Sequence, residues 1–169
     1  VPTYRQNILC SAISEEFGIT ITGTDDKYLI ISNLFDGAAI RSLKIKIIPK
    51  NVIITPGWGF ILVSGYNLIY GKEVYYLSLL NINGIEIKTV ETDFYSEKWV
   101  SWTSVHGFDF VALSTPTGKI YIFEVYYLEK IQPKARAFSS ITYLNYIPKF
   151  KLVIAIAHNG NFVFIPYIE

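Results

Sequence analysis

Short runs of β-branched and aromatic residues alternate with polar or glycine-containing turns along the whole 169-residue chain. In residues 19–24, isoleucine or glycine alternates with threonine, which is the period of two expected of a strand with two unlike faces. Asp36-Gly37 and Asn83-Gly84 each follow such a run, and both pairs favour hairpin turns because they tolerate a positive φ. The pattern predicts short antiparallel strands throughout, and it requires no helix.

One turn, together with the run that follows it, recurs four times. Each repeat is a run of β-branched and aromatic residues, a turn and a second such run. The turns are Asp25-Asp26, Gly71-Lys72, Thr117-Gly118 and Asn159-Gly160, so the steps between positions 26, 71, 118 and 160 are 45, 47 and 42 residues. A step of about 45 residues is the length of one four-stranded propeller blade. We therefore expect an all-β fold: a partial β-propeller of WD40-like type, with about four blades of four antiparallel strands and an incomplete last blade. A β-sandwich also has short strands every 8–12 residues, but it does not explain the recurring pitch.

The expected blades cover the chain from residue 7 to its end, and residues 1–169 are interpreted as one partial propeller domain. The blades span about residues 7–46, 50–92, 97–138 and 140–169, and residues 1–6 are interpreted as the tail of a preceding blade.

Two irregularities stand out within these blades. In the second, a longer connection at residues 65–72 is expected to replace the two-residue turn of the first. The fourth supplies three strands, ending with residues 162–167, so we expect its fourth strand to come from elsewhere or to be absent. Closed propellers have four to eight blades, and the four units are interpreted as an arc of a larger ring. Because the chain begins at Val1 and contains no Met, we interpret it as part of a longer product.

The composition narrows the class of protein. Hydrophobic residues make up 51% and charged residues 17% of the chain, and the charged share is below the roughly 25% of an average soluble domain. A net charge of +1 gives no electrostatic footprint for nucleic acid. Cys10 has no second cysteine to pair with, which favours a cytoplasmic protein. No apolar stretch approaches the roughly 18 residues of a membrane span, so any membrane link is expected to be indirect.

Candidate chemistry is sparse. Ser104, His106 and Asp109 have the residue types of a hydrolytic triad, but they surround one predicted turn and strand alternation directs neighbours to opposite faces. One Cys and two His are poor material for a metal site, and no phosphate-binding glycine loop is present. We therefore expect no enzymatic activity, no cofactor and no metal.

Two segments carry a family resemblance. Cys10–Asp26, CSAISEEFGITITGTDD, and Leu29–Gly37, LIISNLFDG, resemble a WD40-type blade, and more specifically the carboxyl-terminal propeller of BEACH-domain (Beige/neurobeachin-like) proteins. Ile53–Val63 and Asn81–Gly84 are similar to the next blades of those proteins. The Trp-Asp pair that closes the third strand of a typical blade is replaced by Ile31-Ser32, Leu77-Ser78, Phe123-Glu124 and Ile165-Pro166. The hydrogen-bonded tetrad of typical WD40 blades is therefore not carried over.

The resemblance implies a non-catalytic scaffold that binds protein partners. It further implies an adjoining BEACH module, a role in vesicle or membrane trafficking, and a cytoplasmic location with peripheral attachment to vesicle or organelle membranes. Two alternatives stay open from the residues alone: a propeller-class hydrolase and a degenerate repeat with a purely structural role. The hydrolase needs carboxylates on the innermost strands, where the expected first strands have none.

Loops on one face of the expected propeller are the candidate partner surface, because aromatic side chains supply contact area at low entropic cost. We place on this face Asp25, Asp26, Tyr66, Asn67, Leu68, Tyr70, Lys72, Tyr95, Lys98 and His158. The three tryptophans, Trp58, Trp99 and Trp102, are expected to pack between blades.

Overall fold

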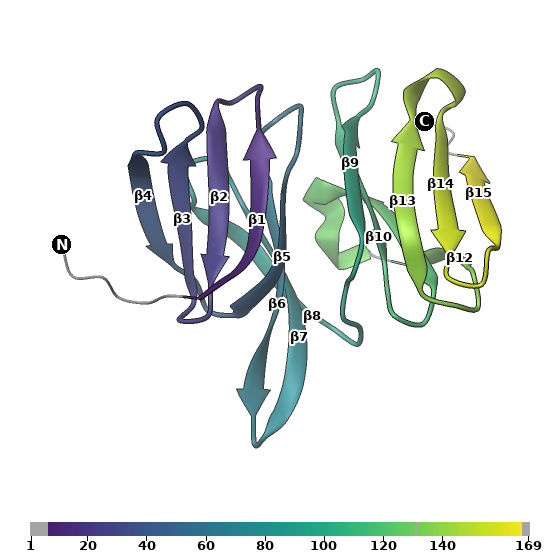
Figure 1. The fold of residues 1–169 in the computed structure, drawn as a ribbon, viewed down its shortest axis with the longest axis horizontal. Helices are drawn as coiled ribbons and strands as arrows, with labels where there is room; N and C mark the ends of the chain where they lie inside the picture. The colour runs from purple at the N-terminus through teal and green to yellow at the C-terminus, as the bar shows by residue number, and fades with distance from the viewer. Residues whose placement is uncertain (1–6, 131, 167–169) are drawn as a thin grey trace. The chain divides into compact units, whose positions relative to one another are not determined.

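The computed structural model describes residues 7–130 and 132–166, and it is built from antiparallel sheets (Figure 1). Three sheets have four strands each and one has three. The predicted all-β architecture, with an incomplete last sheet, is confirmed. The helical elements of the described ranges are two short 3₁₀ segments, η1 (Val125–Lys130) and η2 (Pro148–Phe150). The sequence pattern, which requires no helix, does not indicate these two 3₁₀ segments.

The chain divides into two compact units. The first takes the chain up to Ile54 together with Ile61–Asp93, and the second takes Thr55–Phe60 together with the chain from Phe94 onward. The segment Thr55–Phe60 is the connection between two strands of the first unit, yet it packs with the second. The expected blade bounds stay predictions, and the interpretation of residues 1–6 lies outside the described residues.

The first unit consists of two four-stranded sheets in which strands that are neighbours in sequence are also neighbours in space. The first sheet contains β1 (Ile8–Ser14), β2 (Ile19–Thr24), β3 (Tyr28–Asn33) and β4 (Ala39–Lys44). The second contains β5 (Ile48–Ile54), β6 (Ile61–Ile69), β7 (Lys72–Leu80) and β8 (Glu86–Thr92). β1 and β2 of the first sheet contact β5 of the second.

The alternation read from residues 19–24 places one face of β2 in the core of the first unit. Ile19 and Ile21 are buried there with Leu29, Ile61 and other apolar side chains of both sheets. A Cβ on Gly23 would lie 2.6 Å from the Cys10 sulfur, so glycine allows β2 to approach its neighbours closely. Burial raises the pKa of the Cys10 thiol to about 11, and the thiol is therefore protonated at neutral pH.

The second unit consists of one four-stranded and one three-stranded sheet. The first contains β9 (Trp99–Thr103), β10 (Asp109–Ser114), β11 (Lys119–Glu124) and β12 (Pro133–Arg136), and the second contains β13 (Ile141–Ile147), β14 (Leu152–Ala157) and β15 (Phe162–Pro166). Trp102 lies between the sheets of this unit, 4% exposed, with its ring 4.3 Å from that of Tyr146. The expectation that this tryptophan packs between sheets is confirmed.

Three predicted segments differ from the structure. The longer connection at 65–72 is wrong, because β6 and β7 continue through it as a regular hairpin. The run of apolar and aromatic residues at Ile120–Tyr126 predicts a strand through Tyr126, but β11 ends at Glu124, where η1 begins. The strand predicted over 131–138 corresponds to β12, Pro133–Arg136, within the described residues. Positions 131 and 167, included in two expected strands, lie outside the described residues.

Candidate recognition sites

The predicted partner residues are distributed over both units. Asp25, Asp26, Tyr66, Asn67, Leu68, Tyr70 and Lys72 belong to the first unit, and Tyr95, Lys98 and His158 belong to the second. Whether they share one face stays a prediction.

The two aspartates of the first unit stabilise a turn. The Asp25 carboxylate accepts a hydrogen bond from the Asn7 side-chain amide at 2.8 Å, and the Thr24 hydroxyl donates to Asp26 at 2.5 Å. Between this turn and the second sheet, the Lys27 ammonium donates to the Asn67 side-chain oxygen at 2.8 Å. Through Lys27, the structure therefore brings the Asp25-Asp26 turn close to Asn67.

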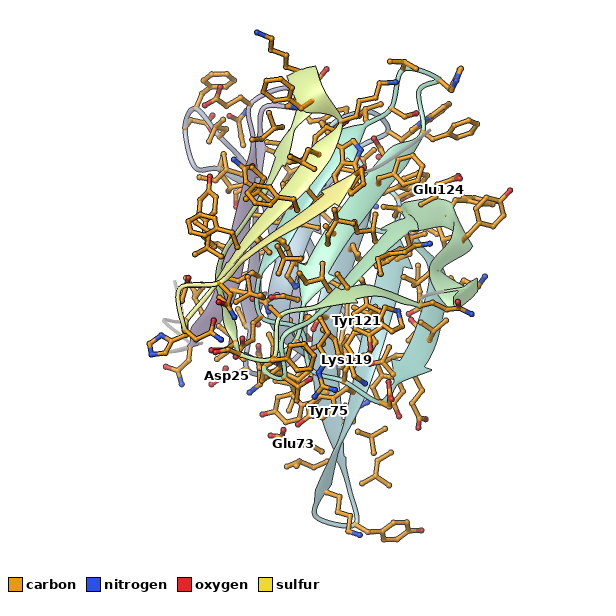
Figure 2. The ribbon with its side chains drawn as sticks, turned by 90° about the vertical axis from the view of Figure 1, so that its right-hand side faces the viewer. Asp25, Glu73, Tyr75, Lys119, Tyr121 and Glu124 are labelled. Atoms are coloured by element: carbon orange, nitrogen blue, oxygen red, sulfur yellow. The ribbon has the colours of Figure 1, made fainter. Side chains whose placement is uncertain are left out.

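Residues 67–74 form a projecting hairpin, which we call the arm. β5 pairs with β6 as far as Tyr66, and β8 pairs with β7 as far as Tyr75, so the arm strands pair only with each other. Figure 1 shows the arm extending beyond the rest of its sheet. At its base, the Tyr75 hydroxyl donates to Glu73 at 2.7 Å (Figure 2). The candidate residues between positions 67 and 72 thus lie on a hairpin and not on a loop.

The tip of the arm is apolar and exposed. Tyr70 and Gly71 form the turn, with φ of 50° and 77°, which are values typical of a two-residue hairpin turn. Tyr70 is 101% exposed, and the side chains of Leu68 and Ile69 beside it are also exposed. Exposed apolar side chains on a hairpin that pairs with nothing else are a feature of contact surfaces.

The three candidates of the second unit do not form a site that the structure reveals. His158 lies in an exposed turn and its backbone amide donates to the Ser140 carbonyl at 2.8 Å. Tyr95 is half-buried, and Lys98 is exposed with its backbone amide directed to the Ser114 hydroxyl. These positions are explained by local turn and strand structure.

A buried carboxylate that sequence reasoning rejected as catalytic holds the turn Thr55–Phe60. Asp109, 3% exposed, accepts four hydrogen bonds. The Gly57 and Trp58 amides donate at 2.9 and 2.8 Å, and the hydroxyls of Thr55 and Thr103 donate at 2.5 and 2.7 Å. A Cβ on Gly57 would lie 2.5 Å from the Asp109 carboxylate, so this turn requires glycine to approach it.

The Asp109 network explains two outcomes. The carboxylate is fully engaged by backbone and threonine donors, while His106 lies exposed and Ser104 accepts from the Phe108 amide. These three residues therefore do not converge as a hydrolytic triad. The network also holds Trp58 outward: its side chain is 65% exposed and its indole donates to the Gly107 carbonyl at 2.6 Å. The expectation that Trp58 packs between blades was wrong.

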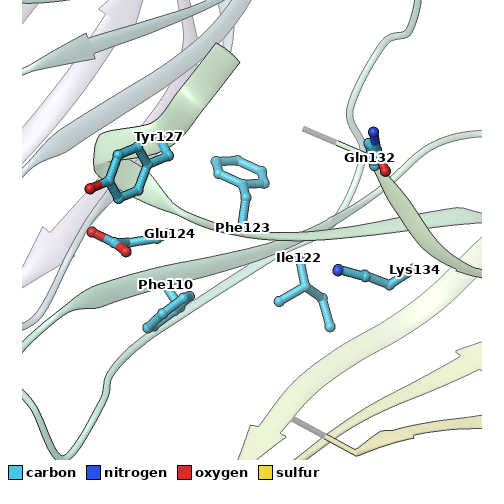
Figure 3. Close-up of a pocket in the computed structure, with 7 residues that line it drawn as sticks. All are labelled: Phe110, Ile122, Phe123, Glu124, Tyr127, Gln132 and Lys134. Carbon is cyan, nitrogen blue, oxygen red and sulfur yellow. The ribbon is translucent and has the colours of Figure 1, made fainter. Parts of the chain in front are cut away.

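Two adjoining hollows open beside this turn, and they share Glu124 and Tyr127. One, of about 330 Å³, is shown in Figure 3 and is lined by Phe110, Ile122, Phe123, Glu124, Tyr127, Gln132 and Lys134. The other, of about 360 Å³, we call the aromatic pocket; it is lined by Trp58, Phe60, Phe108, Asp109, Glu124, Tyr126 and Tyr127.

Local structure explains how these side chains meet. β11 ends at Glu124, and η1 then turns back and carries Tyr126 and Tyr127, whose rings meet edge to face at 5.9 Å. Phe110 of β10 is directly opposite Glu124 in the ladder, and Figure 3 shows the Glu124 carboxylate between the rings of Phe110 and Tyr127. Burial raises the pKa of Glu124 above its ordinary value. The nearest sequence signal is the pair of tyrosines that follows β11, which the apolar pattern includes in part in a predicted strand.

Within the described ranges, no group of three or more metal-ligating side chains gathers at one place. The helical segments of those ranges also lack the length and apolar character that crossing a bilayer requires.

The comparisons with known proteins show a β-propeller type of fold. No family model matches the chain, and a search of curated proteins finds no match. Among solved structures, the computationally designed Ika4 protein matches with a TM-score of 0.65 and 14% identity, covering 100% of this chain and 96% of that one. The Cps50 (Swd1) β-propeller domain of Myceliophteria thermophila matches with a TM-score of 0.60 and 13% identity over 94% of this chain. This chain spans 51% of the Swd1 domain. At these identities the likeness concerns the fold alone.

Proposed function

We propose that this chain is a non-catalytic protein-interaction scaffold and that the arm is its principal partner contact. The observation that carries the proposal is the exposed tip of Leu68, Ile69 and Tyr70, presented on a hairpin that makes no other pairing. A β-propeller fold supports this proposal, because such folds present loops and hairpins from a rigid body.

The finer proposal follows the sequence resemblance. On the segments Cys10–Asp26 and Leu29–Gly37, the chain is proposed to be part of the carboxyl-terminal WD40-type propeller of a BEACH-domain protein. It would then act next to a BEACH module in vesicle or membrane trafficking, in the cytoplasm and peripherally on vesicle or organelle membranes. Sequencing of the gene upstream of Val1 tests this directly: a BEACH module encoded there supports it, and an unrelated domain contradicts it.

Partner capture tests the role of the arm. Residues 67–74 are replaced by Asn-Gly, which keeps a two-residue turn between Tyr66 and Tyr75. A point variant with Leu68→Ser and Tyr70→Ser keeps the arm but removes its apolar tip. Phe35→Ser, at an 86% exposed position of the first unit, is the matched control. Partners retained by wild type and Phe35→Ser, but lost from both arm variants, support the proposal; equal retention by all four proteins contradicts it.

A further inference from the structure

The aromatic pocket combines five aromatic side chains with two carboxylates, and only one of the carboxylates is available to a ligand. An ionised carboxylate offers about four acceptor positions. Those of Asp109 are filled by the Thr55, Gly57, Trp58 and Thr103 donors. Glu124, in contrast, has no hydrogen bond or ion pair to its carboxylate among the side chains that the structure describes, residues 7–128 and 132–166, and Lys134 of the adjoining hollow does not pair with it.

The surroundings of Glu124 favour a positively charged ligand. Its carboxylate is partly desolvated among aromatic rings, so its charge is weakly compensated in the free protein. Aromatic faces attract cations through their quadrupole, and this attraction grows when the cation is removed from water. An anion would be repelled by Glu124, and a purely apolar ligand would leave the carboxylate buried without a partner.

Hydrogen bonds fix one wall of the pocket. Three of the four hydrogen bonds to Asp109, from Thr55, Gly57 and Trp58, hold the turn that carries Trp58, and the Trp58 indole donates to the Gly107 carbonyl. The other walls come from the end of β11 and from η1. A ligand therefore meets a Trp58 ring whose position is already set, which lowers the entropic cost of binding.

We infer that the aromatic pocket binds the guanidinium group of an arginine side chain presented by a partner protein. Arginine fits better than lysine, because a planar guanidinium can stack on aromatic rings while it donates two hydrogen bonds to one carboxylate. Glu124 would accept those hydrogen bonds, and Trp58, Phe108 and Tyr126 would contact the faces of the guanidinium. This inference rests on the proposed scaffold function in one respect, namely that the ligand is a segment of another protein.

Calorimetric titration with short peptides tests the site without the partner. The probe is acetyl-Gly-Leu-Arg-Leu-Gly-amide, and its twin carries citrulline, which has the shape of arginine without the charge. A third peptide carries lysine in place of the arginine. We expect the arginine peptide to bind at least about tenfold more tightly than the citrulline peptide, and the lysine peptide to have an intermediate affinity. Binding should change Trp58 fluorescence, and the change should be absent in Trp58→Phe.

Variants complete the test. Glu124→Gln should reduce the affinity for the arginine peptide by about tenfold and remove the preference over citrulline. Glu97→Gln, a half-buried glutamate of the same unit outside the pocket, should behave as wild type. Equal affinity for arginine and citrulline, an arginine preference that survives in Glu124→Gln, or no saturable binding at millimolar peptide would overturn the inference. The protein with the shortened arm should bind the peptide normally, so failure of the arm proposal and failure of this one are distinguishable.

Discussion

The segment Thr55–Phe60 and the arm lie at the two ends of β6, and they differ in how firmly each is held in place. The segment Thr55–Phe60 that precedes it is fixed by a buried carboxylate with four hydrogen bonds, and it presents Trp58 in a set orientation. The arm, formed by the end of β6 and the start of β7, has strands that pair only with each other; the Lys27–Asn67 hydrogen bond ties it to the first sheet, and Leu68 and Tyr70 lie at its tip. A small pocket for one side chain needs fixed walls, whereas a projecting apolar hairpin can adapt to a partner surface. The chain therefore contains one preformed site and one adaptable contact.

The largest expected effect comes from the carboxylate that fixes the turn. Asp109→Asn places an amide group where the donors of Gly57 and Trp58 converge, and buried donors left without an acceptor are costly. We expect the free energy of unfolding, measured by urea titration, to fall by about 3 kcal/mol. Asp93→Asn, at an exposed position, should change it by less than about 0.5 kcal/mol. Equal effects of the two substitutions would mean that the Asp109 hydrogen bonds do not hold the turn.

A smaller effect should follow from crowding the same turn. Gly57→Ala puts a Cβ 2.5 Å from the Asp109 carboxylate and 2.8 Å from the Thr103 hydroxyl. The cost should be about 2 kcal/mol, with a change in Trp58 fluorescence as the turn shifts. Gly107→Ala is the comparison, because its Cβ meets nothing within 4 Å and only the positive φ of 82° opposes it. Gly107→Ala should lower the free energy of unfolding by about 1 kcal/mol. A larger loss from Gly107→Ala than from Gly57→Ala would contradict the close approach of Gly57 to Asp109.

The stability of the fold should depend on pH through Glu124 of the aromatic pocket. Burial raises the pKa of Glu124 in the folded state, so the fold favours the protonated acid. The stability gained this way is present below the ordinary pKa and is lost as pH rises through the raised folded value. The side chain of Glu124→Gln stays neutral at every pH. The urea concentration at the midpoint of unfolding should therefore be higher than that of wild type at about pH 7 and equal to it at about pH 3. A midpoint that falls below wild type at neutral pH would show that Glu124 already has a stabilising partner.

The smallest effect is expected at the arm. Replacement of residues 67–74 by Asn-Gly removes strands that pair only with each other, and an isolated two-stranded hairpin is marginally stable. The free energy of unfolding, measured by urea titration, should therefore change by less than about 0.5 kcal/mol. Amide hydrogen exchange should also be faster at Leu68 and Glu73 than at Leu62 and Leu79 of the same strands. A large loss of stability would show that the arm supports the fold.

Local patterns in the sequence predict the strands where the signal is short-range. The alternation of residues 19–24 and the turns at Asp36-Gly37 and Asn83-Gly84 correspond to β2 and to the hairpins β3–β4 and β7–β8. The sequence predicts a loop at the arm because Tyr70-Gly71 is not among the common turn pairs, although both residues adopt the required positive φ.

The preformed site could not be predicted, because its contacts span long distances along the chain. The Thr55–Asp109 hydrogen bond joins residues 54 positions apart, and no periodicity signals such a pair. Trp58 is expected between blades because large rings fill the widening gap between sheets, but its backbone is held by Asp109 and its ring is 65% exposed. The strand pattern of Ile120–Tyr126 predicts no change of direction after Glu124, so it gives no sign that Tyr126 and Tyr127 line one pocket with Glu124.

Site-specific photocrosslinking tests the central claim, that this chain contacts partner proteins through the tip of the arm, most directly. A benzophenone amino acid is placed at Tyr70 or, as the control, at Phe35, two strongly exposed aromatic positions of the same unit. In extract from the cells that express the protein, position 70 should form a defined crosslink to one partner, and excess unlabelled wild type should abolish it, while position 35 should form none. Crosslinks of the same pattern and yield from both positions would contradict the account.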